Sequence, residues 1–146
     1  MIVPLNENHV VQVAALEREC FSDPWSEASV RYECENPIST WFAEEREGRV
    51  AGYIGAQSVP PEADVMNLAV APEYRRQGIG RALLRHLEEA LHRDGIETLF
   101  LEVRASNEPA RRLYEASGYR VAGVRKKYYV NPTEDALIMK KELKEC

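Results

Sequence analysis

A glycine-containing turn leads directly into the most regular amphipathic pattern of the chain, and this junction restricts the possible folds more than any other feature. After the turn, apolar residues recur every three or four positions, at Ile79, Ala82, Leu83, Leu87, Ala90 and Leu91. This spacing predicts a helix with one buried face. Asp94-Gly95 predicts its end, because glycine readily takes the left-handed conformation that terminates helices. Residues 64–70 before the turn and 98–103 after the helix predict strands, so we expect a strand–helix–strand crossover.

The remaining patterns place this crossover among antiparallel strands. Ser26 is a good helix N-cap, and Glu47-Gly48 separates two segments that predict a hairpin. Further helices are predicted over residues 9–20, 26–35 and 109–117, and further strands over 40–46, 49–58, 119–130 and 136–141. We therefore expect an α/β fold of the mixed α+β type, in which a mostly antiparallel mixed sheet of about six or seven strands is flanked by about four helices.

Composition narrows the class of protein and its partners. The 146 residues are 45% hydrophobic and 29% charged, which predicts one globular domain spanning residues 1–146. The formal net charge of -5 argues against binding to nucleic acid or to an anionic membrane, and it favours a cationic partner. The amino-terminal residues have neither a basic start nor a long apolar run, so we expect a cytoplasmic protein.

The cysteines and histidines show no pattern typical of a metal site. The three cysteines include no Cys-x-x-Cys pair and the three histidines are scattered, at positions Cys20, Cys34, Cys146, His9, His86 and His92. We therefore expect no metal ion and no disulfide framework, and only structural roles for these side chains. The basic run Arg125-Lys126-Lys127 is short and is predicted to be a solvated strand end.

The turn from Arg75 to Arg81 has the properties of an anion-binding loop. The first turn of a helix leaves its backbone N–H groups without helical partners, and the helix dipole adds partial positive charge at the same end. Gly78 and Gly80 let an anion approach the backbone, and Arg75, Arg76 and Arg81 add full charges. The pattern matches neither the nucleoside-triphosphate loop nor the dinucleotide fingerprint. On these residues alone, a pyrophosphate site and an ordinary exposed loop are both possible.

A longer resemblance surrounds this turn. Residues 67–84 read NLAVAPEYRRQGIGRALL and resemble the acetyl-CoA signature of the GNAT superfamily of N-acetyltransferases. The resemblance implies the GNAT fold, with acetyl-CoA as the acetyl-donor co-substrate and with backbone amides of the turn on its pyrophosphate. The turn residues so implied are Arg76, Gln77, Gly78, Ile79, Gly80 and Arg81, and the strand residues implied to hydrogen-bond the pantetheine arm are Leu68, Ala69 and Val70.

Acetyl transfer requires a neutral amine, and two residues are candidates for moving its protons. Strand alternation in residues 98–104 puts Glu102 on one face with Arg104. Glu102 is either a surface carboxylate paired with Arg104 or, if partly buried, a base for the amine. Tyr114 is either a core aromatic or an acid that protonates the departing thiolate.

The kind of amine decides how strong a base is needed. A peptide α-amino group has a pKa near 7.8 and a lysine side chain a pKa of about 10.4, so preparing neutral lysine costs about 3.5 kcal/mol more at neutral pH. A single carboxylate of modest basicity can therefore serve an α-amine.

A second resemblance narrows the activity within the superfamily. Five segments are similar to the RimI-type ribosomal-protein alanine N-acetyltransferases: residues 101–107, 113–115, 118–119, 23–26 and 128–129. The resemblance implies that Glu102 is the general base, that Tyr114 is the general acid, and that the side chain of Asn107 contacts the coenzyme. It also implies direct attack of the amine on the thioester in a ternary complex, without an acyl-enzyme.

The same resemblance implies an acceptor, the N-terminal alanine of the small-subunit ribosomal protein bS18. A basic N-terminal peptide as partner suits the acidic balance of the chain. In the family, a proline usually follows the tyrosine pair directly, whereas here Val130-Asn131 separates Tyr128-Tyr129 from Pro132. These tyrosines either flank the acceptor groove or are ordinary strand aromatics. Two alternatives therefore stay open: an acetyltransferase for lysine or a small-molecule amine, and a non-catalytic acyl-CoA-binding sensor or adaptor.

Overall fold

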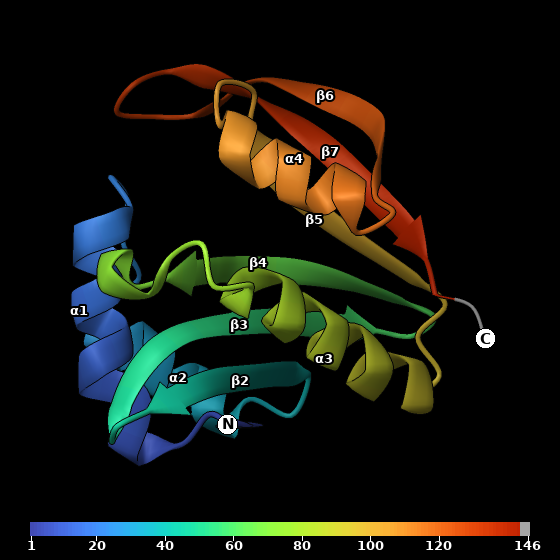
Figure 1. Cartoon of the computed structure of the whole chain (residues 1–146). Coiled ribbons are helices and arrows are strands. Elements are labelled where there is room, and N and C mark those ends of the chain that lie inside the picture. The colour runs from blue at the N-terminus through green and yellow to red at the C-terminus, as the bar shows by residue number, and fades with distance from the viewer. Residues whose placement is uncertain (144–146) are drawn as a thin grey trace.

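A seven-stranded mixed sheet forms the centre of the computed structural model, which describes residues 1–143 (Figure 1). Its strands are β1 (Ile2–Pro4), β2 (Ser39–Arg46), β3 (Arg49–Val59), β4 (Glu62–Val70), β5 (Thr98–Arg104), β6 (Arg120–Tyr129) and β7 (Glu134–Glu142), in the order β1-β2-β3-β4-β5-β7-β6. The helices are α1 (Val10–Cys20), α2 (Glu27–Glu35), α3 (Ile79–Arg93) and α4 (Glu108–Ala116), with short 3-10 turns at Glu7–His9 and Pro72–Tyr74.

The predicted order of elements and the mixed sheet are confirmed. The β4–α3–β5 crossover is the parallel connection, and the other strand pairs are antiparallel. Ser26 caps α2 as expected, because its Oγ accepts the backbone N–H of Ser29 at 3.0 Å. Strand β1 was not predicted, since three residues are too few to show alternation.

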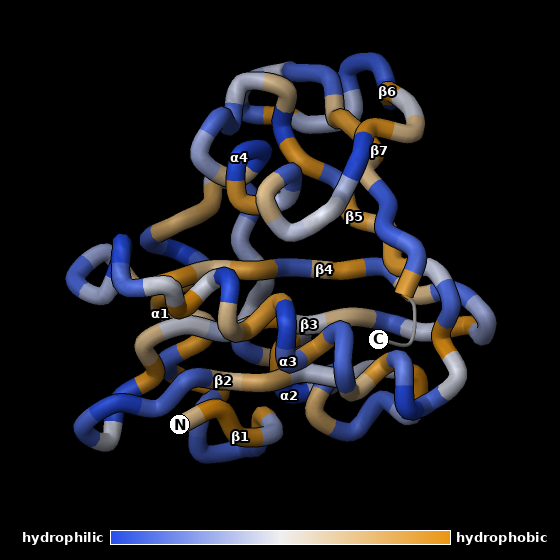
Figure 2. The backbone as a smooth tube through the Cα atoms, turned by 45° about the vertical axis from the view of Figure 1, so that its right-hand side comes forward, coloured by the Kyte–Doolittle hydropathy of each residue, from blue (hydrophilic) through white to orange (hydrophobic). Residues whose placement is uncertain are grey.

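Two hydrophobic clusters cover the two faces of the sheet. One joins α3 and α4 to the strands and includes Leu99, Leu101 and Val103 of β5. The other packs α1 and α2 against β2 and β3. In Figure 2 apolar and polar segments alternate along β4, and several of the peripheral loops carry polar colours. Among the helices described, none is both long and apolar enough to cross a membrane.

Strands β4 and β5 are paired only at their beginnings. The parallel register joins Glu62, Ala63 and Asp64 to residues 98–100 of β5, and in Figure 1 the two strands then diverge toward α1. A register shift against β3 places an extra residue, Met66, in β4, and such bulges bend the strand that contains them. The second half of β4 therefore pairs with β3 on one edge, and within the described residues its other edge has no strand partner.

Candidate active site

A cleft of about 790 Å³ lies where β4 and β5 part. Four segments line it, together with the diverging strands: the α1–α2 loop with residues 21–25, the start of α4, the end of β6, and the β6–β7 turn with residues 130–132. The lining therefore contains residues from both faces of the sheet. A ligand in this cleft can contact the α3/α4 side and the α1/α2 side at once.

The glycine turn opens α3 with the conformation that an anion site requires. Gly78 has a φ of 79° and Arg76 a φ of 64°, so both lie in the left-handed region. The N–H of Ala82 donates to the carbonyl of Gly78 at 3.0 Å, and the N–H groups of the preceding helical residues belong to the first turn, which has no helical acceptors. The side chains of Arg76 and Arg81 are exposed beside this turn.

Two other side chains of the turn serve the fold. The Arg75 guanidinium donates to the carbonyl of Val70 at 3.1 Å and contacts the Cys20 sulfur at 3.5 Å. Gln77 accepts from Arg46 at 2.6 Å through its side-chain oxygen, which ties the turn to the end of β2. The charge of Arg75, expected on the anion, is therefore directed toward β4 and α1.

Residues Leu68, Ala69 and Val70 lie in the second half of β4. Their register partners in β3 are Ile54, Tyr53 and Gly52, and the edge that faces β5 lies beyond the last β4–β5 pair. An extended ligand with its own amides can pair with such a strand edge. This placement agrees with their expected contact with a pantetheine arm.

Glu102 faces the cleft from β5, on the side of the sheet that carries α1 and α2. The neighbouring Leu101 and Val103 point into the α3/α4 cluster, so alternation directs Glu102 the opposite way. Its Oε1 lies 3.3 Å from Nε of Arg125. Its Oε2 is buried and has no hydrogen-bond partner among the described residues. The cleft wall therefore holds a carboxylate oxygen that neighbouring atoms cover and that has no partner by hydrogen-bond geometry.

The ion-pair partner of Glu102 differs from the one expected from the sequence. The ion pair of Glu102 is made with Arg125, whereas Arg104 on the same strand face contacts Glu134 and the β6–β7 turn. The ion pair with Arg104, which was one of the two alternatives for Glu102, is therefore not formed. Arg125 was predicted to be part of a solvated strand end, and its side chain is 56% exposed while its guanidinium reaches across β7 to Glu102.

Tyr114 lies on α4 and reaches the same cleft from the α3/α4 side. The residue is 7% exposed and belongs to the cluster that contains Leu101 and Val103, so it is a core aromatic as well as a cleft residue. Burial, and then the neighbouring Tyr129, raises the pKa of the Tyr114 phenol well above its ordinary value. The phenol is therefore neutral at pH 7, which is the form that a general acid must have before the reaction.

Asn107 has a structural role that its sequence position did not reveal. Its Oδ1 accepts the N–H of Ala110 at 3.2 Å and caps the amino terminus of α4. The residue also lines the cleft, so the side-chain nitrogen is the group that can contact a coenzyme.

The two tyrosines at the end of β6 both line the cleft. Tyr129 lies under the Arg104 guanidinium, 4.5 Å from ring centroid to Cζ. Burial, followed by the Glu102 charge, raises the pKa of Tyr129 to about 12. The Glu102 charge, followed by burial, also raises the pKa of the more exposed Tyr128. Tyr128 and Tyr129 are therefore groove residues in this structure, although two residues separate them from Pro132.

Glu17 contributes to the site but was not singled out from the sequence. It is buried on α1, where its Oε1 accepts the N–H of Trp25 at 2.9 Å and its Oε2 accepts from Asn67 at 2.6 Å and from the Tyr53 hydroxyl. Glu17 thus joins the α1–α2 loop to β4 beneath the cleft. A single glutamate in an amphipathic helix gives no local signal of such burial.

The cysteines within the described residues fit structural roles. Burial raises the pKa of the Cys20 and Cys34 thiols, which makes them poor nucleophiles at neutral pH. Cys146, the third cysteine, lies outside the described residues. No group of three His, Cys, Asp or Glu side chains suited to a metal ion occurs within residues 1–143.

Comparison with known proteins adds independent information. A model of the acetyltransferase (GNAT) family matches residues 10–119. The bS18-alanine N-acetyltransferase of Escherichia coli (strain K12) is 42% identical over 127 residues, which cover 85% of this chain and 84% of the relative. The N-alpha-acetyltransferase RimI of Mycobacterium tuberculosis is 34% identical over 135 residues, which cover 88% and 84%.

Solved structures show the same fold. The crystal structure of the ribosomal-protein-S18-alanine N-acetyltransferase from Escherichia coli matches with a TM-score of 0.90 and 36% identity, covering 100% of this chain and 95% of that one. Arabidopsis thaliana NAA60 in complex with acetyl-CoA matches with a TM-score of 0.89 and 17% identity, covering 98% of each chain. The second likeness concerns the fold alone.

Proposed function

The chain belongs to the GNAT family of acetyltransferases, within its RimI type, and we propose that it acetylates the N-terminal alanine of ribosomal protein bS18 with acetyl-CoA as donor. The chain is an N-acetyltransferase. What the proposal adds is the acceptor and the roles of individual residues. The observation that carries it is the pair Glu102 and Tyr114, which line one cleft from opposite faces of the sheet.

Acetyl-CoA approaches from the α3/α4 side in this proposal. The first turn of α3 offers backbone donors and positive dipole charge to the pyrophosphate, from residues Arg76 to Arg81. The free edge of β4 at Leu68 to Val70 pairs with the pantetheine amides, and the Asn107 amide adds a side-chain contact. The thioester then lies near Tyr114.

The acceptor amine approaches from the α1/α2 side. The amine, in its neutral form, attacks the thioester carbonyl carbon through its nitrogen, and the Glu102 carboxylate takes the one proton that the nitrogen loses as the new carbon–nitrogen bond forms. The carbon–sulfur bond breaks, and the Tyr114 hydroxyl gives its proton to the departing sulfur. The products are an N-acetylated peptide and CoA with a free thiol, so a covalent acyl-enzyme is not needed.

The charge of the acceptor side suits a basic peptide. The cleft carries the carboxylates of Glu102 and Asp23 together with the guanidinium of Arg104, so its own acidic excess is small, and the chain as a whole has a formal net charge of -5. Opposite charge speeds the encounter with a cationic N-terminal tail. An α-amine also loses its proton far more readily than a lysine side chain, which matches a single carboxylate as base.

A two-peptide assay tests the acceptor. Acetyl-CoA is offered with a peptide that has a free N-terminal alanine followed by basic residues, and separately with an N-terminally blocked peptide that has one free lysine. Thiol release with only the first peptide is expected. Acetylation of only the blocked peptide would contradict the α-amine acceptor. An acetyl-CoA-induced thermal shift without thiol release on any amine would favour a sensor.

Glu102→Gln tests the base in the same assay. The substitution keeps the shape of the side chain and removes its basicity, so a loss of kcat of roughly 10²-fold or more is expected at neutral pH. Glu35→Gln, at an exposed position of α2, is the matched control and should retain the wild-type rate. Full activity of Glu102→Gln would exclude Glu102 as the base.

A further inference from the structure

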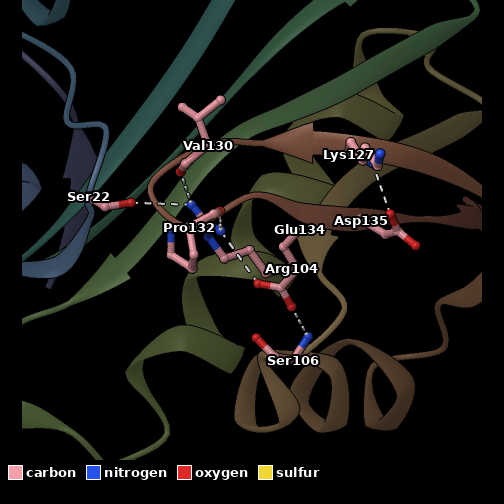
Figure 3. A network of polar contacts seen from close by, with 8 residues as sticks. All are labelled: Ser22, Arg104, Ser106, Lys127, Val130, Pro132, Glu134 and Asp135. Atoms are coloured by element: carbon pink, nitrogen blue, oxygen red, sulfur yellow. Dashed lines mark hydrogen bonds and ion pairs between the residues drawn. The ribbon is translucent and has the colours of Figure 1, made fainter.

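Arg104 of β5 contacts three other segments of the chain, namely the α1–α2 loop, the β6–β7 turn and the start of β7. The residue lies two positions after Glu102, on the same strand face. Its Nη2 donates to the carbonyl of Val130 at 2.8 Å, and its Nη1 donates to the carbonyl of Pro132 at 2.9 Å (Figure 3). The guanidinium thus holds the β6–β7 turn through two main-chain oxygens.

The same guanidinium also reaches the opposite wall of the cleft. Its Nη2 donates to the Ser22 hydroxyl at 3.2 Å, and Ser22 belongs to the α1–α2 loop. Ser22, Val130 and Pro132 all line the cleft. Arg104 is therefore a bridge between two loops that lie far apart in the sequence and face each other across the acceptor side.

Glu134 supports this bridge from the start of β7. One carboxylate oxygen lies 3.4 Å from Arg104 Nη1, and the other accepts the backbone N–H of Ser106 (Figure 3). The hydrogen bond from Ser106, opposed by burial and aided by Arg104, lowers the pKa of Glu134. Tyr129 packs against the other side of the guanidinium. The bridge is therefore anchored to the β5–α4 loop as well.

We propose that Arg104 is a positioning residue for the acceptor, which holds the β6–β7 turn and the α1–α2 loop at a fixed separation around the incoming amine. This inference rests on the proposed function, because it assigns the acceptor to the α1/α2 side. A groove with fixed walls does not have to be ordered when the peptide binds, which lowers the cost of binding. The hydrogen bonds of the guanidinium itself go to Ser22, Val130, Pro132 and Glu134, and none of these residues is among those proposed for the coenzyme.

The chemistry of arginine fits this task better than that of lysine. A planar guanidinium presents several donors in a rigid fork, so one side chain can serve two carbonyls, a hydroxyl and a carboxylate together. A lysine ammonium keeps the charge but is a single point on a flexible stem. Arg104→Lys should therefore restore little of what Arg104→Met removes.

Steady-state kinetics on the full chain test the assignment. With the N-terminal alanine peptide, Arg104→Met should raise the acceptor KM about tenfold or more, as expected for the loss of charge-assisted hydrogen bonds. The KM for acetyl-CoA should stay within about twofold of wild type. Arg85→Met is the matched control, since Arg85 is exposed on α3 and, among residues 1–143, forms its one ion pair with Glu89 of the same helix. It should change neither KM.

A milder variant covers the case in which Arg104→Met does not fold. Ser22→Ala removes only the contact across the cleft and should raise the acceptor KM severalfold without changing the acetyl-CoA KM. Equal increases in both KM values for either variant would indicate a general loss of structure and would overturn the inference. An unchanged acceptor KM would overturn it as well.

Hydrogen exchange separates this inference from the proposed function. Without any peptide, amides of residues 128–135 should exchange faster in Arg104→Met than in wild type, because their turn has lost its anchor. Unchanged exchange would contradict the bridge even if the peptide is a substrate. If wild type acetylates neither peptide while exchange accelerates in the variant, the acceptor assignment fails and the bridge stands as a structural feature.

Discussion

Three carboxylates on the α1/α2 side differ in what surrounds them, and this difference separates the candidate base from structural residues. Glu17 and Glu33 are each buried, and their oxygens accept several hydrogen bonds. Glu102 has one ion-pair partner, and its second oxygen has no partner among the described residues. A proton acceptor needs a free lone pair, so Glu102 is the carboxylate of this set that can take a proton from a substrate.

Removing the Tyr114 hydroxyl tests the acid at the level of one atom. Tyr114→Phe keeps the aromatic ring in the core but leaves the departing thiolate without its proton donor. We expect kcat to fall roughly 10²-fold, within the usual range for general acid catalysis, while the acetyl-CoA KM changes little. Thiol release with the alanine peptide measures both.

The control for Tyr114→Phe is Tyr32→Phe. Tyr32 is 66% exposed on α2, so the loss of its hydroxyl should leave the rate unchanged. A wild-type kcat in Tyr114→Phe would show that the sulfur leaves without help from this phenol, or with a proton from water.

At the scale of elements, the start of α3 has a left-handed glycine within the turn that is proposed to bind the pyrophosphate. Gly78 has a φ of 79°, and a Cβ at this position would meet no atom within 4 Å. Any cost of adding a side chain there is therefore conformational. Gly48, in the turn between β2 and β3, has a φ of 72° and the same open surroundings. Gly48 and Gly78 thus share a left-handed φ and open surroundings but lie in different parts of the fold.

A comparison of Gly78→Ala with Gly48→Ala separates the cost of backbone strain from an effect on coenzyme binding. Gly78→Ala and Gly48→Ala should each lower the free energy of unfolding by about 1–2 kcal/mol, since a non-glycine residue is disfavoured in the left-handed region. Only Gly78→Ala should also raise the acetyl-CoA KM, because it perturbs the donors proposed for the pyrophosphate. Denaturant unfolding and steady-state kinetics measure the two effects. An equal acetyl-CoA KM in both variants would argue against the turn as the pyrophosphate site.

At the scale of the whole molecule, Glu33 joins α2 to the sheet. Its carboxylate accepts hydrogen bonds from Ser39 at 2.9 Å, from Trp41 at 3.2 Å and from Gln57 at 2.9 Å, and Asn36 adds a fourth. Burial alone would raise the pKa of Glu33, but these four bonds outweigh it and lower the pKa below 4.5. The folded state therefore favours the charged form.

A pH-dependent contribution to stability follows from this lowered pKa. The contribution of Glu33 is complete above a pH of 4.5, its ordinary pKa, and is lost as the pH falls through the folded-state value. Glu33→Gln should therefore cost roughly 1–3 kcal/mol near pH 7, and its difference from wild type should shrink below that ordinary value. Urea unfolding across this range measures the difference, and the exposed Glu35→Gln should show none. A difference that grows on acidification would contradict the assignment.

Features set by local sequence were predicted well, and features set by long-range contacts were not. The amphipathic pattern of α3 and the turn before it lie within one continuous segment, so both could be identified. The buried environment of Glu17 depends on Tyr53 and Asn67, and the partner of Glu102 comes from β6 across β7. Sequence alternation placed Glu102 on the correct strand face but selected Arg104 as the neighbour, because alternation describes one strand and not the strands beside it.

The divergence of β4 from β5 also affects how the protein tolerates mutation. A ligand that pairs with the open edge of β4 is recognised by main-chain amides and carbonyls, which every residue except proline supplies equally. Side chains at Leu68, Ala69 and Val70 can therefore change with little loss of coenzyme recognition, as long as the strand keeps its path. Substitutions in the proposed acceptor walls, where Arg104 and Glu102 are proposed to act through their side chains, should have no such tolerance. Over evolutionary time, a site built in this way can keep its donor while its acceptor changes.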